Sequence, residues 1–125
     1  MRLRALALLF CACGAGGTST TSFSGEPLQT LTTTSGLEVK VWTSPQPPAR
    51  GELAVKFEFP NLDGGPLSAS VTPWMPAMGH GATAISTDDA LVAEGINIYM
   101  PGAWELRTQL SGAADDAFIV QLEIP

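Results

Sequence analysis

Two short stretches of the sequence concentrate the side chains that could do chemistry. Residues 74–81 read Trp-Met-Pro-Ala-Met-Gly-His-Gly, and residues 99–104 read Tyr-Met-Pro-Gly-Ala-Trp. Together they hold the only histidine and three of the four methionines of the chain. Thioether sulfur and imidazole nitrogen suit a soft cation such as Cu(I), whereas thioethers are poor donors for zinc or magnesium. The sequence therefore predicts a copper site, and its candidate ligands are Met75, Met78, His80 and Met100.

The first stretch is expected to be a loop. Proline and glycine interrupt strand pairing, so 75–81 should follow a strand that ends near Pro73. Glycines on both sides of His80 allow the backbone to fold tightly, and Met75, Met78 and His80 can then converge on one ion. The alternative is structural, since methionines fill irregular gaps in a core and Pro-Gly pairs make turns. The two readings differ in whether the sulfurs and the imidazole converge and stay accessible.

The N-terminus reads as an export signal. Two arginines precede a short apolar run, which is too short to span a bilayer, and Ala12 lies directly before Cys13. This order resembles a bacterial lipoprotein signal, which implies cleavage after residue 12 and acylation of Cys13; a plain secretory signal is the alternative. We expect 1–12 to be a signal peptide and 13–27, rich in Gly, Ser and Thr, to be a flexible tether.

Length and composition predict one domain, 28–125, and the export signal predicts that it lies outside the cytoplasm. With 45% hydrophobic and 14% charged residues, the chain is too apolar to be disordered. Its formal net charge is −6 and it has no basic cluster, so a nucleic-acid partner is not expected. Removal of the signal would leave one cysteine and no intramolecular disulfide. Multiple acylation would anchor the protein firmly to membrane lipid, on the periplasmic side of either membrane or at the cell surface.

Alternation of apolar and polar residues predicts an all-β domain. In 104–110 every second residue is Trp, Leu, Thr and Leu, and in 117–124 the same period gives Phe, Val, Leu and Ile. About seven to eight short strands, separated by turns rich in glycine and proline, predict an immunoglobulin-like antiparallel β-sandwich, with a small barrel as the alternative. The expected strands are 37–42, 53–59, 68–72, 82–86, 95–100, 104–110 and 117–124, and 87–94 is expected to be loop or strand.

An enzyme is not expected. His80 has no serine nucleophile motif nearby, and acylation would remove Cys13 from any Cys–His pair. The adjacent carboxylates Asp88-Asp89 and Asp115-Asp116 lie in expected turns, where neighbouring side chains point apart. We therefore predict no catalytic residues.

The two stretches also resemble a known family. W-M-P-A-M-G-H-G, followed by E-G-I-N-I-Y-M-P-G-A-W-E-L, is similar to the YtkA-like domain family, which includes the periplasmic part of FixH-type proteins. The similarity covers 37–125. The residues on family positions are Met75, Pro76, Met78, His80, Gly102 and Trp104.

The resemblance implies an immunoglobulin-like β-sandwich that is exported and attached to a membrane. In the FixH branch it also implies a link to the assembly of copper-containing terminal oxidases. FixH-type proteins carry a transmembrane helix, whereas this chain begins with a lipoprotein-like signal.

Two classes of function follow. The first is a lipid-anchored extracytoplasmic domain that binds Cu(I) or assists copper delivery to a membrane metalloprotein such as an oxidase. The second is a metal-free interaction domain that docks on a membrane protein through a sheet edge or through its tryptophan-bearing end.

Overall fold

The computed structural model describes residues 22–125, which form nine β-strands and no helix. Accordingly, none of these residues belongs to a helix that could cross a bilayer. Residues 1–21, with the expected signal peptide and Cys13, lie outside the described part. The strands are β1 (Gln29–Thr32), β2 (Glu38–Ser44), β3 (Gly51–Glu58), β4 (Leu67–Met75), β5 (His80–Gly81), β6 (Ile85–Ser86), β7 (Val92–Ile98), β8 (Gly102–Gly112) and β9 (Ala117–Ile124).

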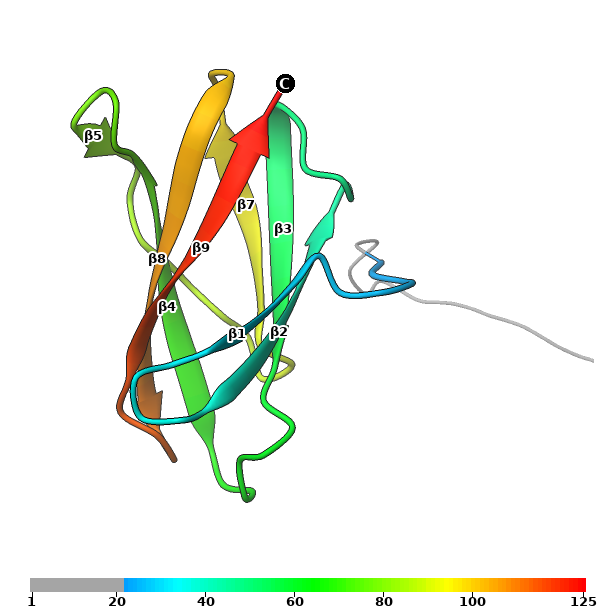
Figure 1. Ribbon diagram of the computed structural model, residues 1–125, viewed down its shortest axis with the longest axis vertical. Coiled ribbons are helices and arrows are strands. Elements are labelled where there is room, and N and C mark those ends of the chain that lie inside the picture. Colours follow the sequence, from blue (N-terminus) through cyan, green and yellow to red (C-terminus); the bar gives the residue numbers. More distant parts are fainter. Residues whose placement is uncertain (1–21) are drawn as a thin grey trace, which may run out of the picture.

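The strands make two antiparallel sheets that face each other (Figure 1). One sheet has the order β1-β2-β3-β7, and the other has the order β5-β4-β8-β9, with β6 also paired to β4. The predicted all-β sandwich is confirmed at this level. The two sheets have separate strand orders, and no single closed sheet of the kind that a barrel requires is formed by the described strands.

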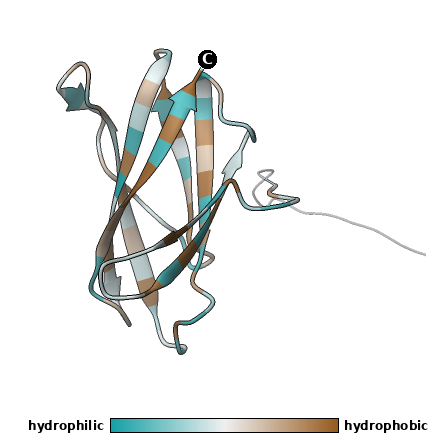
Figure 2. Cartoon of the chain, viewed as in Figure 1, coloured by the Kyte–Doolittle hydropathy of each residue, from teal (hydrophilic) through white to brown (hydrophobic). Residues whose placement is uncertain are grey.

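The core lies between the sheets because β2, β4, β8 and β9 turn alternate side chains, most of them apolar, toward the opposite sheet (Figure 2). In β9 every residue of the set Phe118, Val120, Leu122 and Ile124 is buried, while the residues between them are exposed. Phe118 packs edge-on against Phe57 of the opposite sheet, with ring centroids 5.4 Å apart. The side chains that the sequence pattern predicted to be buried in this strand are thus the ones that are buried in the structure.

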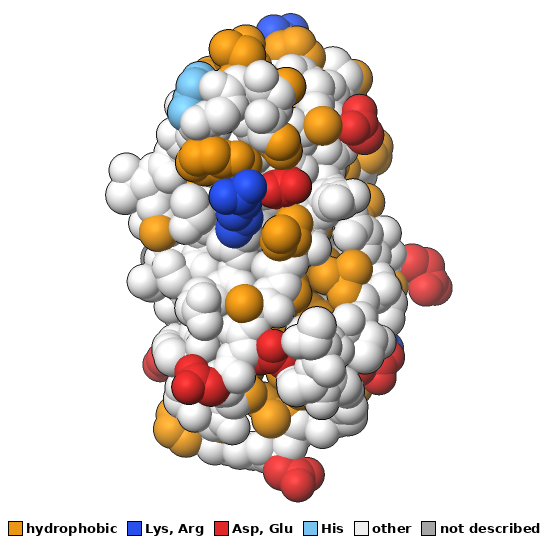
Figure 3. Space-filling model, turned by 60° about the vertical axis from the view of Figure 1, so that its left-hand side comes forward, with side chains coloured by type: hydrophobic (Ala, Val, Ile, Leu, Met, Phe, Trp, Pro, Cys, Tyr) orange, Lys and Arg blue, Asp and Glu red, His pale blue; other side chains and the backbone are white. Residues whose placement is uncertain are grey.

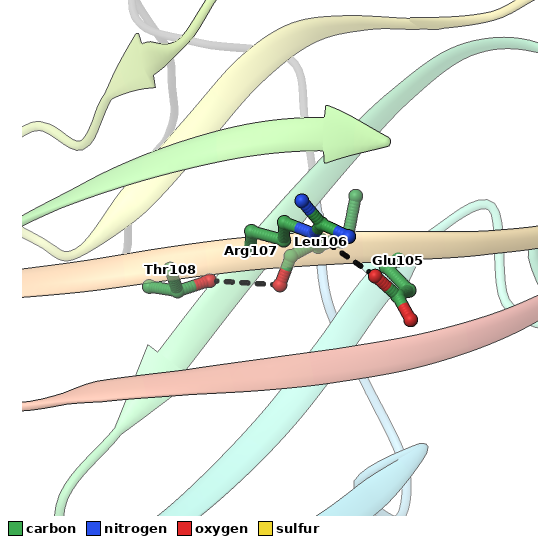
Figure 4. Close-up of polar contacts among 4 residues, drawn as sticks. All are labelled: Glu105, Leu106, Arg107 and Thr108. Carbon is green, nitrogen blue, oxygen red and sulfur yellow. Dashed lines mark hydrogen bonds and ion pairs between the residues drawn. The ribbon is translucent and has the colours of Figure 1, made fainter. Parts of the chain in front are cut away.

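The two faces of β8 carry different chemistry (Figure 4). On the inner face, buried Thr108 donates from its hydroxyl to the carbonyl of Leu106 at 3.2 Å, which satisfies a polar group inside the core. On the outer face, Arg107 donates from Nε to the Glu105 carboxylate at 2.9 Å. The guanidinium of Arg107 also lies over the Trp74 ring, 4.5 Å from its centroid.

Strand β4 ends at Met75, two residues beyond Pro73, near which it was expected to end. Pro73 lies within it, opposite Leu106 of β8. The Pro73 carbonyl accepts a hydrogen bond from the amide of Ala82, away from β8. Because the nitrogen and the carbonyl of a strand residue face the same side, the missing N–H also faces the margin of the sheet, so the proline costs no bond to β8.

Other segments also differ from the predicted boundaries; the expected strand 95–100, for example, is β7 at Val92–Ile98. Strand β1 was not predicted, and the expected strand 82–86 is reduced to the two residues of β6. In 87–94 the Asp88 carboxylate accepts hydrogen bonds from the amides of Ala90 and Val92, which closes a turn before β7. This segment is turn and then strand, as expected.

The described start of the chain lies against the first sheet. The carbonyl of Gly25 accepts a hydrogen bond from the Trp42 indole at 3.1 Å, and that of Glu26 accepts one from Gln46 at 2.8 Å. The Lys56 ammonium lies 4.6 Å from the Trp42 ring centroid. Of the expected tether, residues 22–27 therefore run beside the outer face of β2 and β3.

Candidate metal centre

The predicted ligands lie on and beside a tight hairpin between β4 and β5. The amides of Met78 and Gly79 donate to the carbonyl of Met75 at 3.1 and 3.0 Å, and the Gly79 amide also lies 3.2 Å from the Pro76 carbonyl. Gly79 has a φ of 69°, a left-handed conformation that glycine adopts without steric cost. The expected seven-residue loop is therefore only the turn 76–79, and Met75 and His80 belong to strands.

Gly81 holds β5 against β4. A Cβ atom added at this residue would lie 2.0 Å from the Pro73 carbonyl oxygen, which is far inside van der Waals contact. Only glycine allows the two backbones to approach this closely. The glycine that the sequence suggested as a flexible neighbour of His80 is instead a close-packing residue.

Met75 and His80 are direct partners across the hairpin. Side chains of opposed residues in an antiparallel pair lie on the same face, with Cβ atoms about 5 Å apart. Met75 is 4% exposed and belongs to the core, so of the two criteria given above, convergence and accessibility, its side chain does not meet accessibility in this structure. Its terminal methyl lies 3.4 Å from the point where a Cβ of Gly102 would be. A thioether therefore underlies the hairpin.

His80 is exposed and contacts the connection between β7 and β8. Its Nδ1 lies 3.3 Å from the hydroxyl oxygen of Tyr99, which follows the last residue of β7. The Tyr99 ring packs edge-on against Trp104, with centroids 5.3 Å apart and an interplanar angle of 85°. Tyr99 was not among the predicted site residues, although it directly precedes Met100 in the second stretch.

Met100 lies in the neighbouring turn, between β7 and β8. Its carbonyl accepts a hydrogen bond of 2.9 Å from the indole N–H of Trp104, and its side chain is partly buried against the core. Trp104 itself is 1% exposed. The turn that carries Met100 and Tyr99 is therefore fixed by a buried aromatic residue.

The four predicted ligands share one end of the sandwich, which we call the apolar end: residues 75–80 and 99–104. They differ in accessibility, because Met75 is buried, Met100 is partly buried, and Met78 is 50% exposed on the turn beside His80. Figure 3 shows the histidine near the upper end of the molecule, with hydrophobic side chains over the same end. The structure pairs Met75 with His80 and leaves Met78 as the exposed thioether.

The described residues contain no alternative metal site built from carboxylates, cysteine or histidine. Within residues 22–125, no three His, Cys, Asp or Glu side chains are grouped so that they could hold a metal ion. Asp88 is occupied by its turn. Hydrogen bonds from the hydroxyls of Ser35 and Thr33 and from the amide of Ala117 hold the pKa of Asp116 below its usual range. A metal at the apolar end would depend on thioethers beside the imidazole.

A separate groove of about 530 Å³ lies over the outer face of β4, β8 and β9. It contains Arg107, which is already engaged by Glu105 and Trp74, and the exposed Ile119. It contains none of the predicted ligands.

Comparison of this sequence with protein-family models gave no match, and comparisons with curated proteins and with solved structures gave none either.

Proposed function

We propose that this chain is a lipid-anchored extracytoplasmic domain that binds Cu(I) at its apolar end and assists copper delivery to a membrane respiratory complex. The observation that carries the proposal is the cross-strand pair of Met75 and His80, with Met78 exposed on the turn that joins them. A thioether, an imidazole and a second thioether within one hairpin are the soft, uncharged donors that favour Cu(I) over Zn(II).

The accessible donors, His80 and Met78, would make the first contacts with the ion. Met75 lies beneath them in the core, and Met100 occupies the adjacent turn, so each is a further donor from the body of the domain. The chemistry that copper supplies when bound is that of a soft cation with one-electron redox. The protein contributes the binding, the orientation of the donors and, through Trp104 and the core, an apolar surface behind them.

The immunoglobulin-like part of the proposal has support from strand order. In an immunoglobulin constant-type sandwich, strands A, B and E share one sheet, and strands C, F and G share the other. Here β2, β3 and β7 are successive neighbours in one sheet, and β4, β8 and β9 are successive neighbours in the other. With β5 beside β4, this order fits the architecture that the resemblance implies.

Acylation of Cys13 would keep the domain at a membrane. The motivation is the order Ala12-Cys13-Gly14 after an apolar run. Cys13→Ala is expected to leave the protein unprocessed or to release it from membranes, and Cys11→Ala is the matched control that should do neither. Equal membrane fractionation and mobility of the wild type and Cys13→Ala would overturn the anchoring proposal.

Competition for Cu(I) with a chelator of moderate affinity, under reducing conditions, tests the metal proposal. The wild type should bind Cu(I) more tightly than Zn(II). His80→Ala and Met78→Leu should each weaken Cu(I) binding by more than about tenfold, or about 1.4 kcal/mol. Both residues are exposed, so their replacement should leave the unfolding midpoint nearly unchanged. Binding should also weaken on acidification, because a protonated imidazole cannot coordinate a metal.

One observation favours metal-free docking as a second candidate function. Among residues 22–125, the large hydrophobic side chains that are exposed are Met78, Tyr99 and Ile119, and the first two share the apolar end. Exposed apolar side chains that gather in one place often mark an interaction site. Absence of Cu(I) uptake by the wild type would overturn the copper proposal and leave docking on a membrane protein.

A further inference from the structure

We infer that His80 takes the metal through Nε2 and that Tyr99 is the positioning residue that selects this nitrogen. The inference rests on the proposed copper site and adds to it the coordinating atom and a residue outside the predicted ligand set. The observation behind it is the 3.3 Å contact between the Tyr99 hydroxyl and His80 Nδ1.

This contact restricts which ring nitrogen is available. A neutral imidazole has one protonated nitrogen and one free lone pair. In one tautomer the Tyr99 hydroxyl donates to Nδ1, and Nε2 carries the proton. In the other, Nδ1–H donates to the Tyr99 oxygen, and the lone pair of Nε2 is free. A metal at Nδ1 would have to displace Tyr99, whereas a metal at Nε2 keeps the contact and selects the second tautomer.

Tyr99 is well placed to hold the imidazole still. Its ring rests edge-on against Trp104, which is buried and whose indole N–H is bonded to the Met100 carbonyl. Tyr99 lies in the connection from β7 to β8, and His80 lies in β5, so their contact links two neighbouring turns of the apolar end. Within the described part of the chain, the imidazole makes no other hydrogen bond and no ion pair.

The position of the contact also agrees with the backbone. His80 is opposed to Met75, whose side chain points into the core, so the imidazole leaves the hairpin on the side that faces the other sheet. The Tyr99 contact then fixes the rotation of the ring about its last bond. A hydrogen-bond partner of this kind sets the orientation and basicity of a ligating histidine, and its loss typically lowers metal affinity by about 10- to 100-fold.

Long-range proton–nitrogen NMR of the full chain is a direct test, because the sequence has only one histidine and Cu(I) is diamagnetic. On addition of Cu(I), the Nε2 resonance should shift strongly, and Nδ1 should then have the shift of a protonated nitrogen. Tyr99→Phe retains the ring that packs on Trp104 and removes only the hydroxyl. It should lower Cu(I) affinity by about tenfold, the lower end of that range because the contact is exposed.

Met78→Leu is the matched control. It should lower Cu(I) affinity while the metal-bound protein still shows protonated Nδ1, because the Tyr99 contact is intact. A metal-bound wild type in which Nδ1 carries the metal and Nε2 the proton, or wild-type affinity in Tyr99→Phe, would overturn the role of Tyr99 and leave the copper site standing. No Cu(I)-dependent shift at either nitrogen of the wild type would overturn the copper site and this inference together.

Discussion

The two ends of this sandwich are held in different ways. At the end opposite the apolar end, which we call the polar end, the connections 33–37, 59–66 and 111–116 are tied by hydrogen bonds. Ser35 donates to the Asp116 carboxylate, and Asn61 accepts from the amide of Glu38 and donates to the carbonyl of Gly36 at 3.2 Å. At the apolar end, the turns rest on buried Met75 and Trp104, and the contact of His80 with Tyr99 links two neighbouring turns there.

The difference shows which end has soft donor atoms that are free to bind a ligand. At the polar end the side-chain oxygens of Asp116, Asn61 and Ser68 already bond to neighbouring turns, so a ligand that used them would have to replace existing bonds. At the apolar end the exposed thioether of Met78 and one ring nitrogen of His80 make no hydrogen bond to the described residues. The loops of one end therefore stabilise the fold, and those of the other leave donors free for a ligand.

The largest expected effect separates the two thioethers of the first stretch. Met75→Ala should lower the free energy of unfolding by about 2–5 kcal/mol, because it deletes a buried side chain of the core. Met78→Ala should change it by less than about 0.5 kcal/mol, because that side chain is half exposed. Urea denaturation of both variants measures the difference.

Met75→Leu is the control for this pair, since it keeps a similar volume in the core and removes the sulfur. Its stability should stay within about 1.5 kcal/mol of the wild type. Equal destabilisation by Met75→Ala and Met78→Ala would contradict the description of Met75 as a buried thioether and Met78 as an exposed one.

A smaller effect is expected from two glycines, one at each end. A Cβ at Gly112, where φ is 101°, would lie 2.5 Å from the Pro66 carbonyl oxygen and would disturb the pairing of β8 with β4. Gly112→Ala should therefore cost about 1–3 kcal/mol of stability. Gly81→Ala should cost less, because β5 is a two-residue strand at the sheet margin and can detach.

Copper binding should be affected more by Gly81→Ala than by Gly112→Ala, which is the reverse of their expected effects on stability. Detachment of β5 would move His80 away from Met75 and Tyr99, so Gly81→Ala should lose Cu(I) binding, while Gly112→Ala, at the other end, should retain it. Thermal unfolding combined with chelator competition measures both properties. Retained binding in Gly81→Ala would show that the hairpin pairing does not assemble the site.

Much of the fold could be predicted because long strands repeat their pattern. Strands β2, β8 and β9 alternate strictly enough to reveal both faces, and β3 does so from Val55 to Glu58. Strand β1 contains a single large apolar residue, Leu31, and is defined by its pairing with β2, which local pattern does not encode. The end of β4 was predicted too early because the rule against proline ignores which side of the strand its nitrogen faces.

The candidate site was predictable in composition and less so in geometry. The clustering of methionine and histidine in the sequence pointed to one end of the molecule, and the structure places all four residues there. The burial of Met75 follows from the extension of β4, and the contact of Tyr99 with His80 depends on how two turns meet. Both features depend on residues that are distant in the sequence, so the spacing of residues along the chain could not predict them.

The smallest expected effect concerns the polar end in acid. The Ser35 hydroxyl, the Thr33 hydroxyl and the Ala117 amide hold the pKa of Asp116 below its usual range in the folded protein. Stability from this carboxylate is therefore fully present above the pKa of an unfolded aspartate, about 3.9, and is lost as the pH falls below that value toward the folded one. Asp116→Asn should flatten the dependence of the unfolding midpoint on pH in this acidic range. Asp115→Asn is the matched control, because within the described residues its carboxylate makes no hydrogen bond or ion pair. Equal flattening by both variants would show that net charge, and not the bonds between turns, governs the acid response, and the contrast between the two ends would then lose its electrostatic part.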